Sequence, residues 1–515
     1  MKKVLLIGIL GTLLSGCSIM IDFRQNSNQN STPIITSKDV IVEKPGSIEQ
    51  KGLKGTEYLD YYGDIYQCEF FPSVGTPKML VVPVLFSDTN INSLMYNSSK
   101  IFSDLDKTFN GNNEDTGWES VSSYYKKSSY NNLEMSADVI DSWITLDKTL
   151  QEIMNLDVKT YKDPTWYIVD YVVEELKSQG MDMSEYDSNN DGFIDGIWLV
   201  YGERNYSHWS NQNDDIANFL WAYTFWENNN SPVIGNPKAN AYCWGSYDFM
   251  YEGVNDKTTL KVDAHTFIHE TGHMLGLDDY YDYDENSKLN PAGCLDMMDY
   301  NIGDHNAYSK FLLGWVEPQV FNYEGGTYTL NPFESSGDCL IITSSPNTSI
   351  SPLEEYLIIE FYTPTGLNEL DSTYSYASKY PLMFTQKGVK IYHIDARLGA
   401  FTRSPAGYWK YENYIRNYSY NDLIESTDLK NTYFDIFASN TSSRSYNENY
   451  KLLNLLSEGN SETKYYYNRT YAKNRDLFIR GTSLSGFKFN DGNVLDFEIV
   501  INSLNESAKI FIEGE

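Results

Sequence analysis

Residues 269–279 read H-E-T-G-H-M-L-G-L-D-D, and this stretch decides how the centre of the chain folds. His269 and His273 are four positions apart, so in an α-helix they lie on one face, one above the other. Two imidazoles placed in this way can reach one zinc ion at about 2.0–2.1 Å. Glu270 stands beside the first histidine, where its carboxylate can contact a water on the same ion. The stretch therefore predicts a helix with two zinc ligands and a general base.

A third ligand must come from beyond this helix, because a straight helix carries its next turn away from the metal. Gly276 permits the backbone turn that ends the helix. Asp279, three positions later, can then approach the ion from the side, and aspartate is an accepted zinc ligand. Asp278 competes for this role, and its other interpretation is a solvated or calcium-binding carboxylate. We expect Asp279 to complete the zinc site.

Residues 295–300 read L-D-M-M-D-Y and predict a turn of the chain beneath the metal. Metzincin peptidases, whose third ligand is usually histidine rather than aspartate, have a methionine in such a turn. Met298 fits this position, and Met297 is the alternative. Tyr300 could donate its hydroxyl to the oxyanion of a tetrahedral intermediate. The other interpretations are an ordinary core methionine and one of the chain's 43 tyrosines.

The other four histidines are not expected to bind this metal. His265 continues the stripe of His269 and His273, but eight residues of helix rise about 12 Å, which places it near or beyond reach of the same ion. We therefore interpret it as structural. The remaining histidines are isolated in the sequence and are expected to be packed or at the surface; they are His208, His305 and His393.

Residues 187–195 read D-S-N-N-D-G-F-I-D and match the start of an EF-hand calcium loop, with glycine at its sixth position. The predicted calcium ligands are the side chains of Asp187, Asn189, Asp191 and Asp195 and the backbone carbonyl of Phe193. Position 12 is Trp198 instead of glutamate, so a residue elsewhere would have to complete the site. A structural calcium ion is our prediction, and an Asx-rich turn is the alternative.

The N-terminus predicts export and a lipid anchor. Two lysines precede an apolar run, residues 4–14, which is about half as long as a bilayer requires. The next residues complete a tetrad, Leu-Ser-Gly-Cys, that resembles a bacterial lipobox, so residues 1–17 are predicted to be a signal peptide with lipidation at Cys17. Ordinary signal cleavage is the alternative. Residues 18–75 form a polar tether and N-terminal segment, which would hold an exported protein at a membrane or cell surface or be released with it.

The composition excludes some partners. A formal net charge of −32 argues against nucleic acid, which needs a basic footprint, and against electrostatic docking on anionic lipid. Membrane contact is therefore expected through the N-terminal lipid only. The four cysteines after Cys17 are spaced neither as a zinc ribbon nor as a disulfide-dense scaffold. Cys68 could cap the zinc in a latent form, although a structural thiol is its default interpretation.

The pattern of apolar residues changes at about residue 318. Before it, helical and strand-like segments mix: residues 79–86 predict a buried strand, in which Pro83 predicts an edge position or a bulge, and residues 165–178 predict a helix. After it, the pattern alternates with period two, with candidate strands at residues 328–330, 340–343, 356–362, 389–394, 494–501 and 509–512. The predicted fold is an α/β (α+β) metzincin-like zinc peptidase domain, residues 76–318, followed by an antiparallel β-rich domain, residues 319–515.

From about residue 78 to its C-terminus the chain resembles the immune inhibitor A family of secreted bacterial metallopeptidases. The residues that carry the resemblance are D-D-Y-Y-D at 278–282, C-L-D-M-M-D-Y at 294–300, K-F-L-L-G-W at 310–315 and D-G-F-I-D-G at 191–196, with segments at 355–360 and 388–395. The resemblance implies zinc-dependent endopeptidase activity on proteins and stabilisation by calcium. It also implies that His269, His273 and Asp279 are zinc ligands and that Glu270 is the base. The N-terminal segment departs from the family, because it is short for a large folded propeptide.

These features together predict a secreted, lipid-anchored zinc metalloendopeptidase that hydrolyses protein or peptide substrates. Zinc would lower the pKa of a water and polarise the scissile carbonyl, while Glu270 would take the water proton and pass it to the leaving amine. Two alternatives remain open. One is a catalytically inert surface adhesin or binding lipoprotein on the same fold, and the other is a zinc hydrolase of a non-peptide bond.

Overall fold

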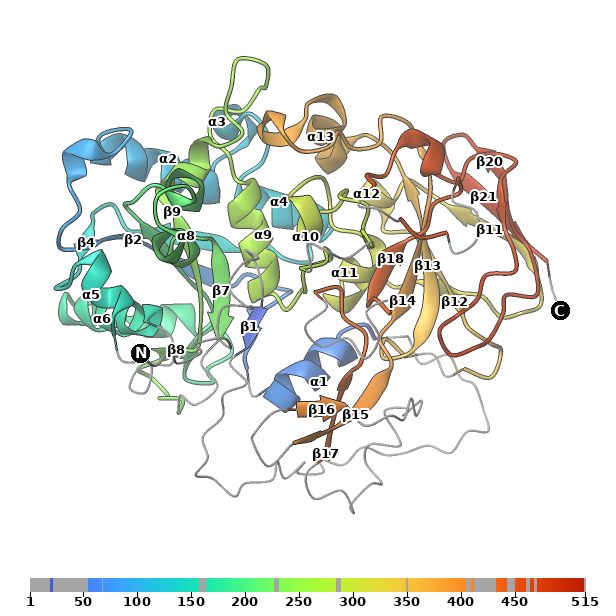
Figure 1. Ribbon diagram of the computed structural model, residues 1–515, viewed down its shortest axis with the longest axis horizontal. Helices are drawn as coiled ribbons and strands as arrows, with labels where there is room; N and C mark the ends of the chain where they lie inside the picture. Colours follow the sequence, from blue (N-terminus) through green and yellow to red (C-terminus); the bar gives the residue numbers. More distant parts are fainter. Residues whose placement is uncertain are drawn as a thin grey trace, which may run out of the picture.

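The computed structural model has a mixed α/β fold with several sheets and a β-rich C-terminal part (Figure 1). The predicted mixed class is therefore confirmed. The structure describes residues 19–21, 54–66, 68–156, 164–226, 231–283, 289–348, 351–403, 409–411, 432–441, 450–459, 464–466 and 470–513. The predicted lipobox, including Cys17, and most of the predicted tether lie outside the described residues. Within these ranges, no helix is long and apolar enough to cross a membrane.

The first sheet has the strand order β1-β7-β9-β6-β2-β3, and β4 also pairs with β2. Its pairs are parallel, except that β7 runs antiparallel to β9. The strands are β1 (Ile19–Ile21), β2 (Lys78–Leu85), β3 (Ser136–Val139), β4 (Ile144–Thr145), β6 (Ile197–Tyr201), β7 (Tyr223–Trp226) and β9 (Ala241–Ser246). A short separate sheet pairs β5 (Phe193–Ile194) with β8 (Lys238–Ala239).

Helices cover both faces of this sheet, which explains why β2 is apolar on both sides. Alternate β2 residues belong to two different cores, Met79 and Val81 to one, Leu80 and Val82 to the other. On the first face lie α2 (Ser98–Asn110), α4 (Val121–Ser128) and α9 (His265–Met274), and on the second lies α6 (Thr165–Ser178). The remaining helices of this part are α1 (Glu57–Tyr66), α3 (Asn113–Thr116), α5 (Leu150–Met154), α7 (Tyr206–Trp209), α8 (Asp214–Phe219), α10 (Met297–Tyr300) and α11 (Ala307–Leu312).

Pro83 lies inside the sheet, so its predicted edge position is wrong. β2 has β6 on one side and β3 and β4 on the other. Pairing with β3 ends at Val81, and pairing with β4 begins at Val84. Pro83 falls in the gap between the two partners, so its missing N–H removes no ladder hydrogen bond there.

The C-terminal part is built from two larger sheets and one smaller sheet. A five-stranded sheet contains β10 (Gln319–Val320), β12 (Cys339–Thr343), β13 (Glu355–Tyr362), β14 (Gly388–Asp395) and β18 (Leu453–Leu455) in that order. A four-stranded sheet contains β11 (Gly326–Leu330), β21 (Ala508–Ile512), β20 (Ile499–Leu504) and β19 (Ser483–Leu484). A third joins β16 (Trp409–Tyr411), β15 (Leu398–Arg403) and β17 (Thr432–Ile436), and two short helices are α12 (Phe333–Ser336) and α13 (Glu369–Thr373). All pairs are antiparallel except β10 with β12.

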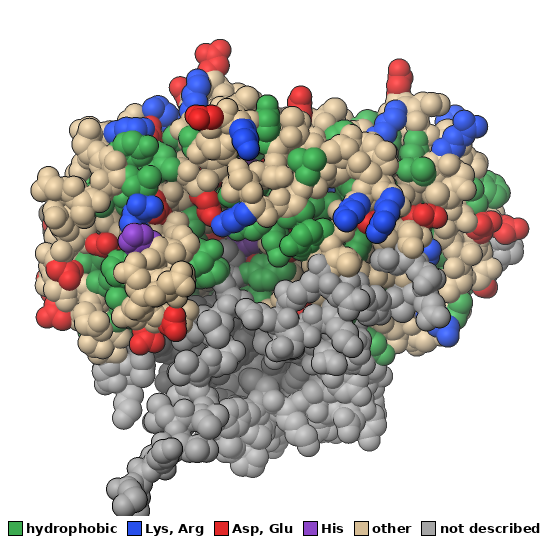
Figure 2. Space-filling model, turned by 45° about the horizontal axis from the view of Figure 1, so that its top comes forward, with side chains coloured by type: hydrophobic (Ala, Val, Ile, Leu, Met, Phe, Trp, Pro, Cys, Tyr) green, Lys and Arg blue, Asp and Glu red, His purple; other side chains and the backbone are tan. Residues whose placement is uncertain are grey.

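One hydrophobic core joins the two predicted domains. It contains Phe267 and Ile268 of α9 together with Tyr356 and Ile358 of β13. The division at residue 318 therefore stays a prediction about sequence pattern, and packing crosses it. Acidic and basic side chains are interspersed with hydrophobic ones on the face drawn in Figure 2.

Candidate metal centre

Helix α9 is buried along its whole length and carries the centre of the site. All ten of its residues are buried, because helices and strands surround it. The Tyr125 hydroxyl donates to the Ile268 carbonyl at 2.6 Å, and the Trp198 indole N–H donates to the Thr271 hydroxyl at 3.1 Å. The helix begins at His265 and ends at Met274, before the turn at Gly276. These contacts hold the helix in a fixed position against α4 and β6.

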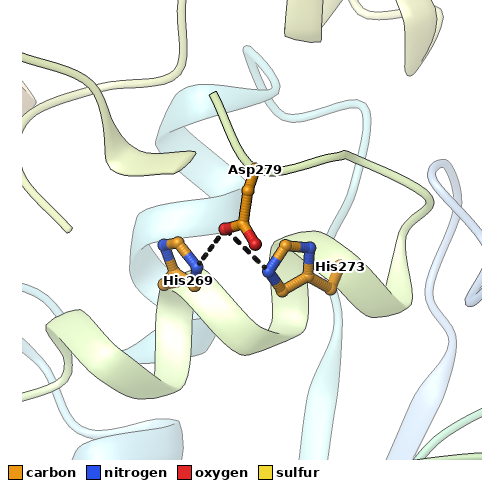
Figure 3. A group of neighbouring side chains, drawn as sticks. All are labelled: His269, His273 and Asp279. Atoms are coloured by element: carbon orange, nitrogen blue, oxygen red, sulfur yellow. Dashed lines mark ion pairs between the residues drawn. The ribbon is translucent and has the colours of Figure 1, made fainter. Parts of the chain in front are cut away.

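The structure brings His269, His273 and Asp279 together (Figure 3). Asp279 Oδ1 lies 3.2 Å from His269 Nε2 and 3.3 Å from His273 Nε2. The candidate ligand atoms of the three residues all lie within 4.8 Å of one another, and all three residues are buried. Asp278, the competing carboxylate, is outside this group.

The histidine rings are held in the orientation that a metal ligand requires. The Nδ1–H of His269 faces the Met297 carbonyl at 2.7 Å, and that of His273 faces the Leu277 carbonyl at 2.7 Å. A hydrogen bond from Nδ1 leaves the lone pair on Nε2, the arrangement found in metal-ligating histidines. Apart from one another, the two Nε2 atoms and Asp279 Oδ1 have no hydrogen-bond partner among the described residues. Buried polar atoms without partners are rare, so this donor set fits a cation such as Zn²⁺.

The pKa shifts of His273 and Asp279 also indicate that the two groups interact strongly. Burial opposes a charged imidazole, but the Asp279 carboxylate outweighs it and raises the pKa of His273 to about 9. Burial also opposes ionisation of Asp279, yet His273 and His269 lower its pKa. The carboxylate therefore stays charged in a buried position. A bound cation would replace the shared proton between these groups.

A sharp turn after α9 brings Asp279 back to the histidines. Gly276 has φ +101°, a left-handed conformation, and an added Cβ would come within 2.7 Å of Leu59. The Tyr280 N–H donates to the Met298 carbonyl at 2.8 Å, which fixes the residue after Asp279. The Tyr283 hydroxyl donates to Asp279 Oδ2 at 2.5 Å. Both carboxylate oxygens are thereby oriented, with Oδ1 directed at the histidines.

Both methionines of the predicted turn have a part in the site. The Met297 backbone carbonyl orients His269, as described above. The sulfur of Met298 lies against α9, since a Cβ added at Gly272 would meet it at 2.6 Å. Asp296 caps α10 by accepting from the Met298 N–H at 2.9 Å. Met298 therefore lies against α9 at Gly272, and its role as the methionine beneath a metal stays a prediction.

Glu270 lies on α9 beside β7. The Thr224 hydroxyl lies 2.8 Å from the Glu270 carbonyl and 3.4 Å from its carboxylate oxygen Oε2. The Cys243 thiol also donates to the Glu270 carbonyl, at 3.4 Å. Sequence reasoning missed Thr224 and Cys243, because no spacing connects β7 and β9 with α9. These contacts join the candidate base to two neighbouring strands of the first sheet, β7 and β9.

Tyr300, the predicted oxyanion donor, contacts Cys294 and Tyr380. Its side chain is about half-buried, and burial, together with Cys294 and Asp299, raises its pKa. Its hydroxyl lies beside the Cys294 thiol, and its ring centroid is 5.2 Å from that of Tyr380. A role as oxyanion donor stays a prediction.

His265 and His393 pair with carboxylates outside the three clustered residues, whereas His305 lies close enough to His269 to be affected by its charge. His265 Nδ1 lies 2.7 Å from Asp263 and Nε2 lies 3.5 Å from Asp371. Burial lowers its pKa, but the two carboxylates outweigh burial and raise it to about 10. His393 pairs with Glu355 at 2.7 Å, while His305 is buried among aromatic rings.

The predicted calcium loop directs its side chains onto its own backbone. Asp187 accepts from the N–H groups of Asp191 and Gly192, each at 3.0 Å, and Asn189 also accepts from Asp191 at 3.0 Å. Asp191 accepts from the Phe193 N–H at 2.8 Å, and Asp195 accepts from the Ser188 N–H at 3.0 Å. Burial, with Asp191 and Asp187 nearby, raises the pKa of Asp195. A calcium site here stays a prediction.

In the described part of the chain no disulfide is formed, and the buried cysteines are Cys68, Cys243, Cys294 and Cys339. Burial and Glu69 raise the pKa of Cys68 to about 12, so its thiol is neutral at ordinary pH. Cys68 is also outside the group formed by the two histidines and Asp279. Its contacts are those of a core residue.

Comparison of the chain with models of known protein families gives no match, and comparison with curated proteins gives none either.

Proposed function

We propose that this protein is a zinc-dependent endopeptidase, with His269, His273 and Asp279 as the metal ligands. The observation that carries the proposal is the convergence of three buried donor atoms without other partners. Three protein ligands leave a fourth position for water or substrate, which is the pattern of catalytic zinc sites, whereas structural sites have four. The mixed α/β fold around α9 is compatible with the metzincin-like arrangement that the sequence predicts.

The residues of the site have distinct parts in this proposal. Bound zinc would supply Lewis acidity, which lowers the pKa of a water and polarises the scissile carbonyl. Glu270 takes the proton of the attacking water and delivers it to the leaving amine. The Met297 and Leu277 carbonyls keep the histidines in the tautomer that presents Nε2. Tyr300 is proposed to share the oxyanion once substrate is bound.

A peptide is the substrate that the neighbouring sheet edge favours. β7 contains Thr224, which contacts Glu270, and β7 pairs on its outer side with the extended segment β1. The register places Thr224 opposite Ile19. An edge that accepts one extended segment can accept another by the same backbone hydrogen bonds. This argues for peptide bonds over the non-peptide alternative.

The N-terminal sequence adds a proposed location. Export and lipidation at Cys17 would place the enzyme at a cell surface or membrane, where proteins outside the cell are its substrates. We also propose a structural calcium ion in the loop of residues 187–195.

Replacing Glu270 by Gln tests the proposal. We expect cleavage of casein or gelatin to fall by about 10²–10⁴-fold in kcat/KM, because the base is lost, while the zinc content stays that of the wild type. Glu203→Gln is the control, since that carboxylate bonds Thr89 and no residue of α9. Wild-type activity must also disappear with a zinc chelator and return with zinc. Full activity of Glu270→Gln would contradict the assignment.

One observation favours a second candidate, a binding lipoprotein with a structural metal. The side chains of His269, Glu270, His273 and Asp279 are fully shielded from solvent, as in closed metal sites. This candidate predicts that the wild type binds zinc but cleaves nothing in a protein mixture. Mass spectrometry of products from such a mixture separates the two and also detects a non-peptide substrate.

A further inference from the structure

We propose that Lys451 and Asn440, in the β-rich part of the chain, are positioning residues for the metal. They hold the loop that carries Asp279, the ligand that α9 does not supply. This inference rests on the proposed zinc site. It extends that site to the segment around β18, which none of the sequence motifs includes.

The first observation is a buried ion pair. Lys451 Nζ lies 2.8 Å from Asp282 Oδ2, and the two side chains are 0% and 2% exposed. A buried lysine is unusual unless its charge is paired, and loss of one partner leaves an uncompensated charge. Asp282 is three residues after Asp279 in the same loop. The position of this loop is therefore tied to that of Lys451.

The second observation is a hydrogen bond from the Asn440 side-chain amide to the backbone of Tyr280, the residue after Asp279. Asn440 Nδ2 donates to the Tyr280 carbonyl at 2.9 Å, across 160 positions of sequence. The Asn440 side chain is itself held, because its Oδ1 accepts from the Leu453 N–H at 3.0 Å. Lys451 Nζ donates to the Asn440 carbonyl at 3.4 Å, which joins the two residues. Asn440 and Lys451 thus form one unit at the start of β18.

The third observation is that this unit belongs to a rigid frame. β18 is the edge strand of the five-stranded sheet and pairs with β14 (Figure 1). The Leu455 N–H donates to the Pro291 carbonyl at 2.8 Å, close to the turn that contains the two methionines. On its other side the ligand loop is fixed by the Tyr280 hydroxyl, which is 2.7 Å from Ser309 Oγ. Asp279 is thereby placed between α9 and the C-terminal sheet.

The chemical consequence concerns metal affinity. Asp279 is the one ligand outside the helix, so its distance from the histidines depends on the loop and its anchors. Groups that orient metal ligands typically change metal affinity by about 10–100-fold when they are replaced. We expect Lys451→Met to weaken zinc binding by that factor. Asn440→Ala removes one hydrogen bond and leaves the ion pair, so a smaller loss is expected.

The test is a competition titration of the full chain with zinc alone against a chromophoric chelator. The matched control is Lys390→Met, which breaks another buried pair of the same sheet, Lys390 with Glu360 at 3.2 Å. Both lysine variants are expected to lower the melting temperature of the metal-free protein. Only Lys451→Met and Asn440→Ala are expected to raise the Kd for zinc. If Lys451→Met does not fold, Asn440→Ala carries the test.

Cobalt gives a second readout of geometry. The visible spectrum of Co²⁺-loaded Lys451→Met should shift toward that of Asp279→Ala, whereas Lys390→Met should keep the wild-type spectrum. A zinc Kd of Lys451→Met and Asn440→Ala within twofold of wild type would overturn the inference while leaving the zinc site intact. A wild type that binds no zinc would instead overturn the proposed function itself.

Discussion

The cluster of His269, His273 and Asp279 and the acidic loop of residues 187–195 are both predicted as metal sites. In the structure, the polar atoms of the two regions differ in their hydrogen-bond partners. In the cluster, His269 Nε2, His273 Nε2 and Asp279 Oδ1 converge in a buried position without other partners. In the loop, Asp187, Asn189 and Asp191 already accept hydrogen bonds from the loop's backbone N–H groups. Among the described residues, only the cluster brings three such ligand atoms close together.

The difference teaches how a motif becomes a site. A buried donor without a partner costs free energy, so its persistence indicates a ligand that compensates it. A loop whose carboxylates already accept backbone hydrogen bonds has no such cost, and it can fold with or without an ion. We therefore expect zinc to affect stability strongly and calcium weakly.

Zinc removal should have the largest effect. At free zinc about 1,000 times its Kd, bound metal should add about 4 kcal/mol to the free energy of unfolding. His273→Ala should abolish this dependence, because one of three donors is lost, whereas Asp191→Ala in the loop should retain it. Denaturant unfolding in zinc-buffered solutions measures both. If the free energy of unfolding of the wild type does not depend on zinc, the cluster is not a zinc site and does not differ from the loop in this respect.

Replacement of His265 tests a histidine of the same helix whose partners are carboxylates. The folded pKa of about 10 exceeds the ordinary 6.5, so its stabilisation is complete below about pH 6.5 and is lost as pH rises through about 10. His265→Gln should lower the free energy of unfolding by about 3 kcal/mol near pH 6.5, since Asp263 and Asp371 lose their cation. The difference from wild type should shrink toward pH 10 in unfolding experiments. A difference independent of pH would show that the charge of His265 is not the cause.

Calcium removal should have a smaller effect than zinc removal. Calcium sites of extracellular modules bind with Kd of about 10⁻⁴–10⁻³ M, so millimolar calcium should add about 1 kcal/mol of stability. Asp187→Ala should eliminate this increment, and magnesium should not replace calcium, because Mg²⁺ demands a stricter octahedral geometry. Thermal unfolding with calcium or with a calcium chelator measures it. The same melting temperature in both would identify the loop as an Asx-rich turn.

Replacement of His305 should have the smallest effect. It tests whether a buried polar atom without a hydrogen-bond partner is enough to indicate a metal ligand. Both ring nitrogens of His305 lack a hydrogen-bond partner among the described residues, and burial lowers its pKa well below the ordinary value. No carboxylate converges on it as Asp279 does on His273. His305→Phe should therefore change stability by less than about 1 kcal/mol and leave the zinc Kd unchanged. A large loss of zinc affinity would assign His305 to the site.

Local pattern predicted much of the fold because the geometry of a helix or strand repeats along the chain. The apolar spacing of residues 165–178 predicts a helix, and α6 has those bounds. The strand expected at 494–501 instead begins at Ile499, because Val494 forms a separate bridge with Lys488 in a preceding tight turn. Pro83 was placed wrongly because its tolerance depends on a gap between two neighbouring strands.

The sequence by itself singled out the two histidines, the proposed base and the turn at Gly276, since helical spacing and backbone conformation are local properties. It left Asp278 and Asp279, and Met297 and Met298, as alternatives. Only the tertiary structure directed Asp279 to the histidines and gave the two methionines different contacts. It also added Thr224 beside Glu270 and Lys451 beneath the ligand loop. These contacts depend on how distant strands and helices pack together, and no local spacing encodes that packing.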